Sequence, residues 1–284
     1  MNLQASLSYR LVPVYEKLVQ LKFSSVLKKE YGHSNKFELR FFCGKNQATL
    51  LKYSLLSILK ADKKLPHIQI FSDGSLTEDH LPLPILEKFN GYSLVELPEL
   101  MMEFHSRKYL MMYSHLPMIK KYMVLFYKSK YEYVVYADTD ILWFSSIQEM
   151  VNEMGENKLT MCYDYMYGYD EQLLEACSWK DMKKKPPLNA GVVIIKNNFA
   201  NGVGFAEKIL QKSQVEGGHW TEQTMIARQV LDLKSEIIPE KRIMCSVKDK
   251  YHLFPIKNMY KKLGARHFVT PVRHLFWRDL FWKI

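Results

Sequence analysis

The sequence lacks a long hydrophobic run and has few cysteines. No stretch approaches the ~18 consecutive apolar residues of a membrane-spanning helix, and the first 20 residues lack the apolar core of a secretory signal peptide. The four cysteines are far apart and form no Cys-x-x-Cys pair, which argues against a zinc ribbon or a redox dithiol: Cys43, Cys162, Cys177 and Cys245. We therefore expect free thiols in a reducing compartment.

No internal repeat and no low-complexity linker interrupts the 284 residues, a length that can bury a sizeable core. With 48% hydrophobic and 25% charged residues, the chain is typical of a globular protein. The formal charge of +10 is unevenly spread. Residues 1–45 carry 8 basic and 3 acidic side chains, residues 46–240 carry 21 and 25, and residues 241–284 carry 11 and 2. A mildly acidic middle therefore lies between two basic ends.

Hydrophobic patterning predicts the order of the secondary structure. Residues 13–30 predict an amphipathic helix with one apolar face, made of Val14, Leu18, Leu21, Phe23, Val26 and Leu27. Further on, strands are expected at Phe37–Cys43, His67–Phe71, Tyr92–Glu96, Tyr131–Ala137 and Gly191–Ile195, and helices at Gln47–Lys60, Arg107–Lys128 (kinked or begun by Pro117) and Thr221–Leu231. This alternation predicts an α/β fold with a mostly parallel sheet, whose site lies beyond the carboxyl ends of the strands.

The sharpest motif is Asp138-Thr139-Asp140, between the apolar strand YEYVVYA and the apolar run ILWF. Two carboxylates at the end of a buried strand are costly unless they are paired or bind a cation. Hard carboxylate oxygens suit Mg²⁺ or Mn²⁺, and such an ion can stabilise charge on a departing diphosphate. The alternative is a surface turn with two solvated acids.

Three further motifs carry polar groups with a functional and a structural interpretation. Asn189, in Leu188-Asn189-Ala190-Gly191, could bind a sugar hydroxyl or simply mark a turn. Glu222 and Gln223 could lie at a reacting centre or merely begin a helix. His267 could complete a metal site with the two acids or be structural. Arg273, six residues later, could hold a phosphate oxygen.

The order of these motifs, DTD after a strand, NAGV before a strand, EQ at a helix start and HF with Arg273 near the end, resembles the GT-A glycosyltransferases. It is most similar to the retaining family of glycogenin and the bacterial lipopolysaccharide galactosyl- and glucosyltransferases. The similarity covers residues 37–277. It implies a Rossmann-like, mixed but mostly parallel sheet flanked by helices. It also implies metal-dependent transfer of a hexose, with retention, from a nucleotide-diphosphate sugar (UDP-sugar favoured) to a hydroxyl of a glycan, glycolipid or other acceptor.

The resemblance also implies roles for individual residues. Mn²⁺ or Mg²⁺ would be held by Asp138, Asp140 and His267. Asn189 would contact the donor sugar, with Glu222 and Gln223 near the anomeric carbon. The nucleotide-sugar would be bound by Cys43, Gly44, Lys45, Asp73, Arg107 and Arg273. The C-terminal motif departs from the family's HFxGxxKPW, since Thr270 replaces Gly, Arg273 replaces Lys and His274-Leu275 replace Pro-Trp. An inverting reaction would instead need a base such as Glu222.

Three segments are expected: an amphipathic helical segment (1–36), a GT-A catalytic domain (37–265) and a closing segment with a basic, aromatic tail (266–284). The last 44 residues hold 11 Lys/Arg and 8 aromatics, which could bind single-stranded nucleic acid or an anionic membrane. We favour the membrane and expect no specific nucleic acid. That predicts a cytoplasmic protein, peripheral on the inner face of the membrane, where a lipid-linked acceptor would be found.

Other classes fit the sequence less well. Gly202-Val203-Gly204 resembles the start of a dinucleotide fingerprint, but Glu207 stands at the third glycine position. A sugar-nucleotide pyrophosphorylase would need a glycine-rich loop near the N-terminus that residues 37–60 lack. The remaining alternative is a non-enzymatic binding protein for nucleic acid or membrane, built on a degenerate GT-A domain. The intact DTD opposes it.

Overall fold

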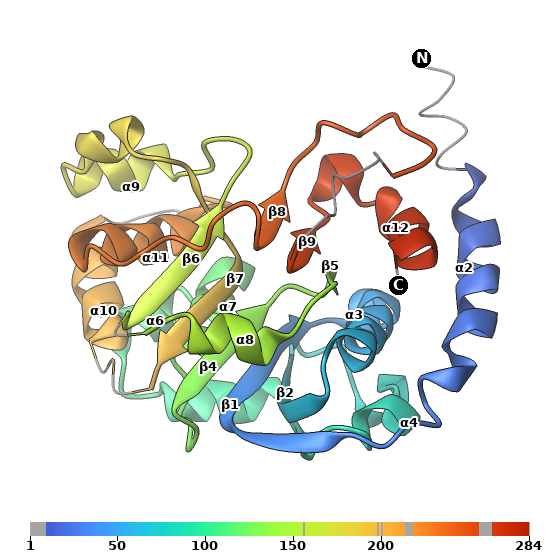
Figure 1. The fold of residues 1–284 in the computed structure, drawn as a ribbon. Helices are drawn as coiled ribbons and strands as arrows, with labels where there is room; N and C mark the ends of the chain where they lie inside the picture. Colours follow the sequence, from blue (N-terminus) through green and yellow to red (C-terminus); the bar gives the residue numbers. More distant parts are fainter. Residues whose placement is uncertain are drawn as a thin grey trace.

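The structure is a computed structural model that describes residues 10–155, 157–197, 199, 201–213, 218–255 and 263–283. Its centre is a six-stranded sheet in the order β3-β2-β1-β4-β7-β6 (Figure 1). The strands are β1 (Gly32–Cys43), β2 (Lys64–Ser72), β3 (Tyr92–Val95), β4 (Tyr133–Ala137), β6 (Leu159–Tyr163) and β7 (Leu188–Lys196). The first four run parallel, and β7 runs antiparallel to both of its neighbours. The predicted mixed, mostly parallel α/β sheet is confirmed.

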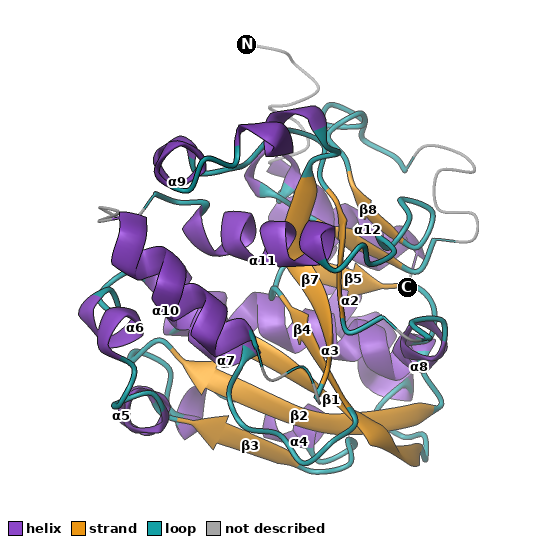
Figure 2. Ribbon diagram, turned by 90° about the vertical axis from the view of Figure 1, so that its left-hand side faces the viewer, coloured by secondary structure: helices purple, strands orange, loops and turns teal. Residues whose placement is uncertain are grey.

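Helices cover both faces of this sheet (Figure 2). They are α2 (Val12–Lys22), α3 (Ala48–Ala61), α4 (Leu83–Leu86), α5 (Leu97–Glu103), α6 (Lys108–Met112), α7 (Pro117–Leu125), α8 (Ile147–Asn152), α9 (Glu171–Ala176), α10 (Gly202–Ser213), α11 (Thr221–Asp232) and α12 (Leu275–Lys283). Because side chains alternate along a strand, Val135 packs in the core under α3 and α12, while Val134 and Tyr136 pack in the core under α7, α10 and α11. Strand β4 is therefore buried on both sides.

A second, three-stranded sheet joins the C-terminal segment to the middle of the chain. It consists of β5 (Ile141–Trp143), β9 (Ala265–His267) and β8 (Ile243–Cys245), in the order β5-β9-β8. Strand β9 is antiparallel to β5, with Ile141 opposite His267. Because β5 directly follows Asp140, this pairing carries His267 to the acids at the end of β4.

Several element boundaries differ from the sequence prediction, and the helix expected over residues 13–30 ends at Lys22. The expected helix Arg107–Lys128 is divided into α6 and α7, and Pro117 begins α7. Leu116 before it is extended, as the residue before a proline usually is. The expected strand Phe37–Cys43 begins earlier, at Gly32.

The prediction of which residues form the buried face of the N-terminal helix is partly wrong. Val14 and Leu18 are exposed, whereas Val19 is fully buried. The reason is a tertiary contact, because α2 packs against α12 and the rings of Tyr15 and Phe281 lie 5.7 Å apart. Phe23 and Val26 are buried as expected, and the side chain of Leu21 lies outside the described part of the structure.

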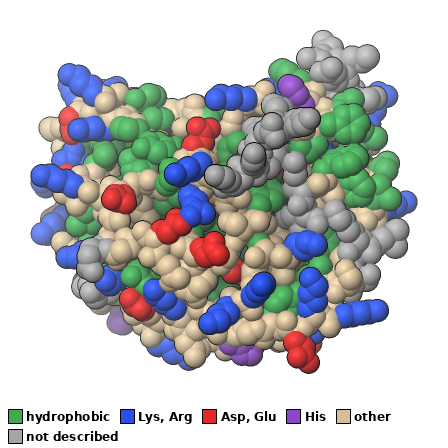
Figure 3. All heavy atoms as spheres, in the orientation of Figure 1, with side chains coloured by type: hydrophobic (Ala, Val, Ile, Leu, Met, Phe, Trp, Pro, Cys, Tyr) green, Lys and Arg blue, Asp and Glu red, His purple; other side chains and the backbone are tan. Residues whose placement is uncertain are grey.

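The C-terminal aromatic residues divide between the core and the surface, where Tyr251 and Phe254 are exposed. Phe268, Phe276 and Trp277 are buried against α3 and β5, and Trp282 is half exposed. Tyr260 lies outside the described residues. On the face seen in Figure 3, basic and acidic side chains are interspersed. None of the described helices is long and apolar enough to cross a bilayer.

Part of the basic charge of the C-terminal segment is also buried, in a cluster of four charged side chains. Arg266 on β9 binds Asp249 at 2.6 Å and Asp279 at 2.7 Å, and Arg278 on α12 binds the same two acids at 2.6 and 2.7 Å. All four side chains are at most 2% exposed. Burial alone would raise the pKa of Asp249, but the two guanidinium groups hold it below its ordinary value. The cluster fixes α12 to β9.

We predict that Asp249→Ala lowers the free energy of unfolding by about 3–5 kcal/mol, because it removes one of the two acids that the buried arginines share. Urea denaturation of the purified variant measures this. The control is Glu103→Ala, which removes the exposed ion pair with Lys128 and should change stability little. Equal free energies of unfolding for the two variants would show that the buried cluster does not stabilise the fold.

Candidate active site

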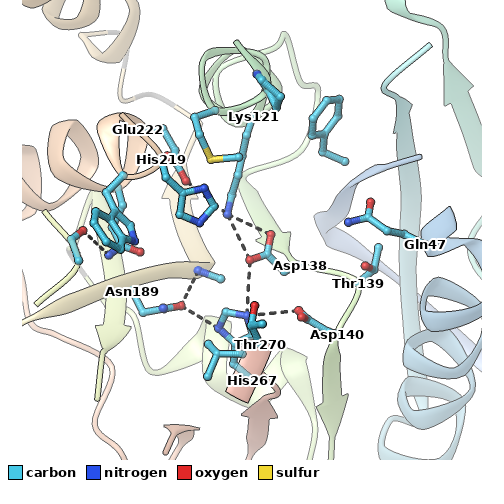
Figure 4. Close-up of a pocket in the computed structure, with 18 of the residues that line it drawn as sticks. Gln47, Lys121, Asp138, Thr139, Asp140, Asn189, His219, Glu222, His267 and Thr270 are labelled. Carbon is cyan, nitrogen blue, oxygen red and sulfur yellow. Dashed lines mark hydrogen bonds and ion pairs between the residues drawn. The ribbon is translucent and has the colours of Figure 1, made fainter. Parts of the chain in front are cut away.

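A pocket of about 990 Å³ opens beyond the carboxyl ends of β1 and β4. It is lined from several directions: Gly44 and Asp73 follow β1 and β2, Asp138 and Asp140 follow β4, and α11 contributes its first turn. The C-terminal segment closes it with His267, Thr270 and Arg273. The close-up in Figure 4 shows Lys121, Asp138, Asp140, Asn189, Glu222 and His267 converging on one region. The pocket therefore lies where the α/β topology predicts a ligand site.

The two acids and the histidine form one cluster. His267 Nε2 lies 3.2 Å from Asp140 Oδ1 and 3.6 Å from Asp138 Oδ2. One possible ligand atom from each of the three residues lies within 4.8 Å of the others. Two carboxylate oxygens and one imidazole nitrogen form a donor set that suits Mn²⁺ and Mg²⁺. The structure thus brings together the three metal ligands predicted from the sequence, and their chemistry fits the ion.

Charges around the cluster compensate one another. Arg273 donates from Nε and Nη2 to Asp140 Oδ2, at 3.0 and 2.7 Å. Burial would raise the pKa of Asp140, but His267 and Arg273 lower it below its ordinary value. For His267 burial would lower the pKa, but Asp140 and Cys245 raise it well above 6.5. Asp140 is therefore an anion held by two cationic neighbours.

Lys121 is a buried cation that the sequence analysis missed. Its Nζ, carried by α7, lies 3.0 Å from Asp138 Oδ1 and 3.6 Å from Glu222 Oε1. Burial opposes its charge, yet the two acids raise the pKa of Lys121 above 10.5, so it is an ammonium at neutral pH. The one signal in the sequence was a pair of lysines, Lys120 and Lys121, within an otherwise apolar helical stretch. Lys121 joins the metal cluster to the first turn of α11.

Glu222 is a buried carboxyl with a raised pKa. It is 3% exposed, and its Oε2 has no hydrogen-bond partner among the described residues. Burial raises its pKa to about 7, with Lys121 opposing the shift. A group that titrates near neutrality can hold or transfer a proton under physiological conditions. The predicted Glu222 thus lines the pocket with a chemistry suited to catalysis.

Gln223 and Asn189 are held by the protein itself. Gln223 Oε1 accepts from the Ala190 amide at 3.1 Å, and Gln223 Nε2 donates to the Gly168 carbonyl at 2.7 Å. Asn189 Nδ2 donates to Asp164 Oδ2 at 2.9 Å. Asp164 was not singled out from the sequence, where it stood within a tyrosine-rich tract. These bonds fix both amides at the wall of the pocket.

The predicted nucleotide-binding residues divide into two groups. Gly44 and Asp73 line the pocket, and a Cβ at position 44 would collide with the Asp73 carboxylate, so the close approach requires glycine. Cys43 is fully buried and Lys45 is exposed, and neither lines the pocket. Arg107 is an exposed residue at the start of α6, also outside the lining. Asn46, Gln47 and Ser75 line the pocket instead and were missed.

The pocket rim carries an exposed tryptophan and an exposed methionine. Trp220 and Met166 line the pocket, and both are exposed. Tyr165 also lines it, whereas Tyr167 donates its hydroxyl to the Lys185 carbonyl at 2.8 Å and lies outside the lining. A planar indole at a pocket mouth is a surface on which a sugar ring can stack.

The six-stranded sheet with one reversed strand, the small sheet and the acid pair after β4 together define the GT-A glycosyltransferase fold. No family model matches the sequence, and no curated protein matches it. Solved structures do. One is the galactosyltransferase LgtC in complex with donor and acceptor sugar analogues, with 15% identity over 82% of this chain and 87% of LgtC, at a TM-score of 0.54.

Two further similar structures are also glycosyltransferases. Mouse xyloside xylosyltransferase 1 shares 11% identity over 86% of this chain and 99% of its own, at a TM-score of 0.56. GlyE from Streptococcus pneumoniae shares 14% over 88% and 61%, at a TM-score of 0.56. At these identities the likeness establishes the fold, and the GT-A fold predicted from the order of the motifs is confirmed.

Proposed function

We propose that the protein is a metal-dependent glycosyltransferase that moves a sugar from a nucleotide-diphosphate sugar to an acceptor hydroxyl. The observation that carries this proposal is the convergence of Asp138, Asp140 and His267 in the large pocket of a GT-A fold. The similar LgtC structure, which holds donor and acceptor sugar analogues, supports it. A degenerate, non-catalytic domain is not favoured, because the acid pair, His267 and the pocket are all in place.

Mn²⁺ or Mg²⁺ bound by Asp138, Asp140 and His267 would supply Lewis-acid stabilisation of the departing diphosphate. Arg273, half exposed above Asp140, can bind diphosphate oxygens through its planar guanidinium. Lys121 holds Asp138 and Glu222 in place and adds a positive charge beside them. These fixed charges favour the negative charge that develops as the sugar leaves.

The donor that we propose is a UDP-hexose. The nucleoside end would occupy the wall formed by Gly44 and Asp73, which line the pocket beyond β1 and β2. The sugar would lie beside Asn189, Glu222 and Gln223. We propose a glycan or a lipid-linked sugar as the acceptor, stacked on Trp220 at the rim.

Retention of the anomeric configuration is the stereochemistry that we propose. Gln223, whose amide is fixed at the pocket wall, would lie beside the anomeric carbon and need not transfer a proton. Inversion is the second candidate, favoured by one observation, since the pKa of Glu222 near 7 suits a general base. The anomeric configuration of the first product, read by NMR before it equilibrates, distinguishes the two.

A cytoplasmic location with peripheral binding to an anionic membrane stays a prediction. Its remaining basis is a pair of exposed rings, Phe254 and Trp282, whose centroids lie 5.7 Å apart. Co-sedimentation of wild type and a Phe254→Ala/Trp282→Ala variant with anionic vesicles tests it. Equal binding of the two would refute the role of these rings.

A thermal-shift screen of nucleotide-sugars tests the proposed function. At a donor concentration 100 times its Kd, binding should stabilise the fold by about 2.7 kcal/mol, which raises the Tm by roughly 5 °C for a chain of this size. The shift should require Mn²⁺ and disappear with excess EDTA, because the diphosphate would bind through the ion. Stabilisation by a donor that is unchanged in EDTA would refute the metal-dependent function.

A further inference from the structure

One hydrogen bond joins two motifs that lie far apart in the sequence. Asn189 Oδ1 and His267 Nδ1 are 2.9 Å apart, and both residues are 6% exposed. Because an imidazole nitrogen can donate or accept, and because an amide can be turned over, this distance alone does not say which atom carries the proton. The hydrogen-bond partners of Asn189 determine which atom carries the proton.

The orientation of the Asn189 amide is fixed by two partners of opposite kind. Its oxygen also receives the backbone N–H of Gly191 at 2.7 Å, and a backbone N–H can only donate. Its nitrogen faces Asp164 Oδ2 at 2.9 Å, and a carboxylate can only accept. Turning the amide over would oppose donor to donor and acceptor to acceptor. The oxygen therefore faces His267, and His267 Nδ1 must donate.

The consequence concerns the other nitrogen of the ring. With a proton held on Nδ1, Nε2 is the nitrogen that can give up its proton and offer its lone pair to a metal ion. It points toward the carboxylates of Asp140 and Asp138, at 3.2 and 3.6 Å. The contacts from Asp164 through Asn189 to His267 thus set which nitrogen of the imidazole can be a metal ligand.

Gly191 leaves the space that the His267 ring occupies. A Cβ at this position would collide with Nδ1 and Cε1 of His267 and also crowd Asn189 Oδ1. The adjacent backbone is fixed as well, because the Gly191 carbonyl accepts from the Asp138 amide at 2.8 Å. The Asn189-Ala190-Gly191 segment therefore combines a hydrogen-bond acceptor with an open space that a single imidazole fills.

We propose that Asn189 and Asp164 are positioning residues that, with Gly191 leaving space for the ring, hold His267 with its proton on Nδ1 and Nε2 toward the acid pair. The inference rests on the proposed function in that His267 serves there as a metal ligand. Asn189 would thus orient His267 in addition to making the sugar contact that the motif implies. Asp164, which the sequence analysis missed, would act on the metal site indirectly, by orienting the Asn189 amide.

The test compares the Mn²⁺ affinities of purified variants, measured by the EPR signal of free Mn²⁺. Asn189→Leu, which is similar in size but cannot accept, should bind Mn²⁺ about 10–100-fold more weakly, as is usual for loss of a partner behind a metal ligand. Gly191→Ala should lose affinity to a similar degree. Gly204→Ala is the matched glycine control, because a Cβ there meets ordinary van der Waals distances, and it should bind as the wild type does.

The rescue variant is Asn189→Asp combined with Asp164→Asn. It keeps the net charge and exchanges the two side-chain types, so that an acceptor still faces Gly191 and His267 while an amide donates from position 164. It should bind Mn²⁺ close to the wild-type affinity, a result that a merely structural role of Asn189 would not predict. Thermal unfolding of every variant shows whether it is folded.

Ring ¹⁵N spectra of His267 give a second measurement that needs no metal and no activity. Nδ1 should carry a proton in the wild type with and without Mg²⁺, and at a pH where the ring is neutral Asn189→Leu should lose this preference. A neutral wild-type ring with its proton on Nε2, or wild-type Mn²⁺ affinity in folded Asn189→Leu, would overturn the inference. Failure of the wild type to bind Mn²⁺ would instead refute the proposed function, and the ring spectra would then decide the inference alone.

Discussion

Asp140→Asn is expected to lower the rate of sugar transfer at least ~10³-fold at saturating donor. The substitution keeps the size of a side chain that is 6% exposed but removes the charge that faces His267 and Arg273. A metal ion stabilises the transition state by several kcal/mol, and each 1.36 kcal/mol corresponds to about tenfold in rate. Initial rates of transfer, measured across a Mn²⁺ titration, give the effect.

The matched control for this variant is Glu240→Ala, which removes an exposed acid from the turn before β8. It should transfer sugar at the wild-type rate. Excess Mn²⁺ should restore little activity to Asp140→Asn, because a ligand is lost from a set of three. A variant that transfers sugar normally at micromolar Mn²⁺ would show that Asp140 is not part of the metal site.

Glu222→Gln is expected to change activity and stability in opposite directions. Burial raises the pKa of Glu222 from 4.5 to about 7 in the folded protein. Between these two values the folded state binds a proton that the unfolded chain has released, so stability falls as the pH rises from 4.5 to 7 and is constant above. Gln cannot ionise and avoids this cost. Transfer should nevertheless fall about 10²-fold or more if Glu222 moves a proton.

The expected gain in stability is about 3 kcal/mol at pH 8 and close to zero at pH 4, from 1.36 kcal/mol for each unit of pKa shift. Urea denaturation of wild type and variant in EDTA, over this pH range, measures it. If the difference between the two proteins is the same at every pH, the pKa of Glu222 is not raised. If Glu222→Gln keeps full activity, the carboxyl serves to shape the pocket only.

The sheet and the acid pair could be predicted because they depend on local patterns. YEYVVYA is apolar on both faces, which indicates a strand buried between two layers of helices, and DTD follows it directly. The carboxyl ends of neighbouring strands then gather at one edge of the sheet. His267 was predicted by the resemblance of the motif order, and pairing of β9 with β5 is the physical reason that it reaches the acids.

Lys121 and Asp164 could not be predicted, because their roles arise from packing between distant segments. Lys121 is one of many lysines until α7 places it between Asp138 and Glu222. The face of α2 was assigned wrongly for the same reason, since its buried side is decided by α12, more than 250 residues later. Three of the C-terminal rings that suggested a surface tail, Phe268, Phe276 and Trp277, belong to the hydrophobic core.

The pairing of β9 in the small sheet has a consequence for the order in which the protein is made. A ribosome completes the six-stranded sheet with β7, about 70 residues before it reaches His267. Strand β9 lies between β5 and β8 and contacts both, so neither has its partner until then. The nascent chain can thus assemble its main sheet while its acid pair still lacks the histidine. The proposed metal site is therefore completed late in synthesis, and a chain ending after Gly264 would lack one of its three proposed ligands.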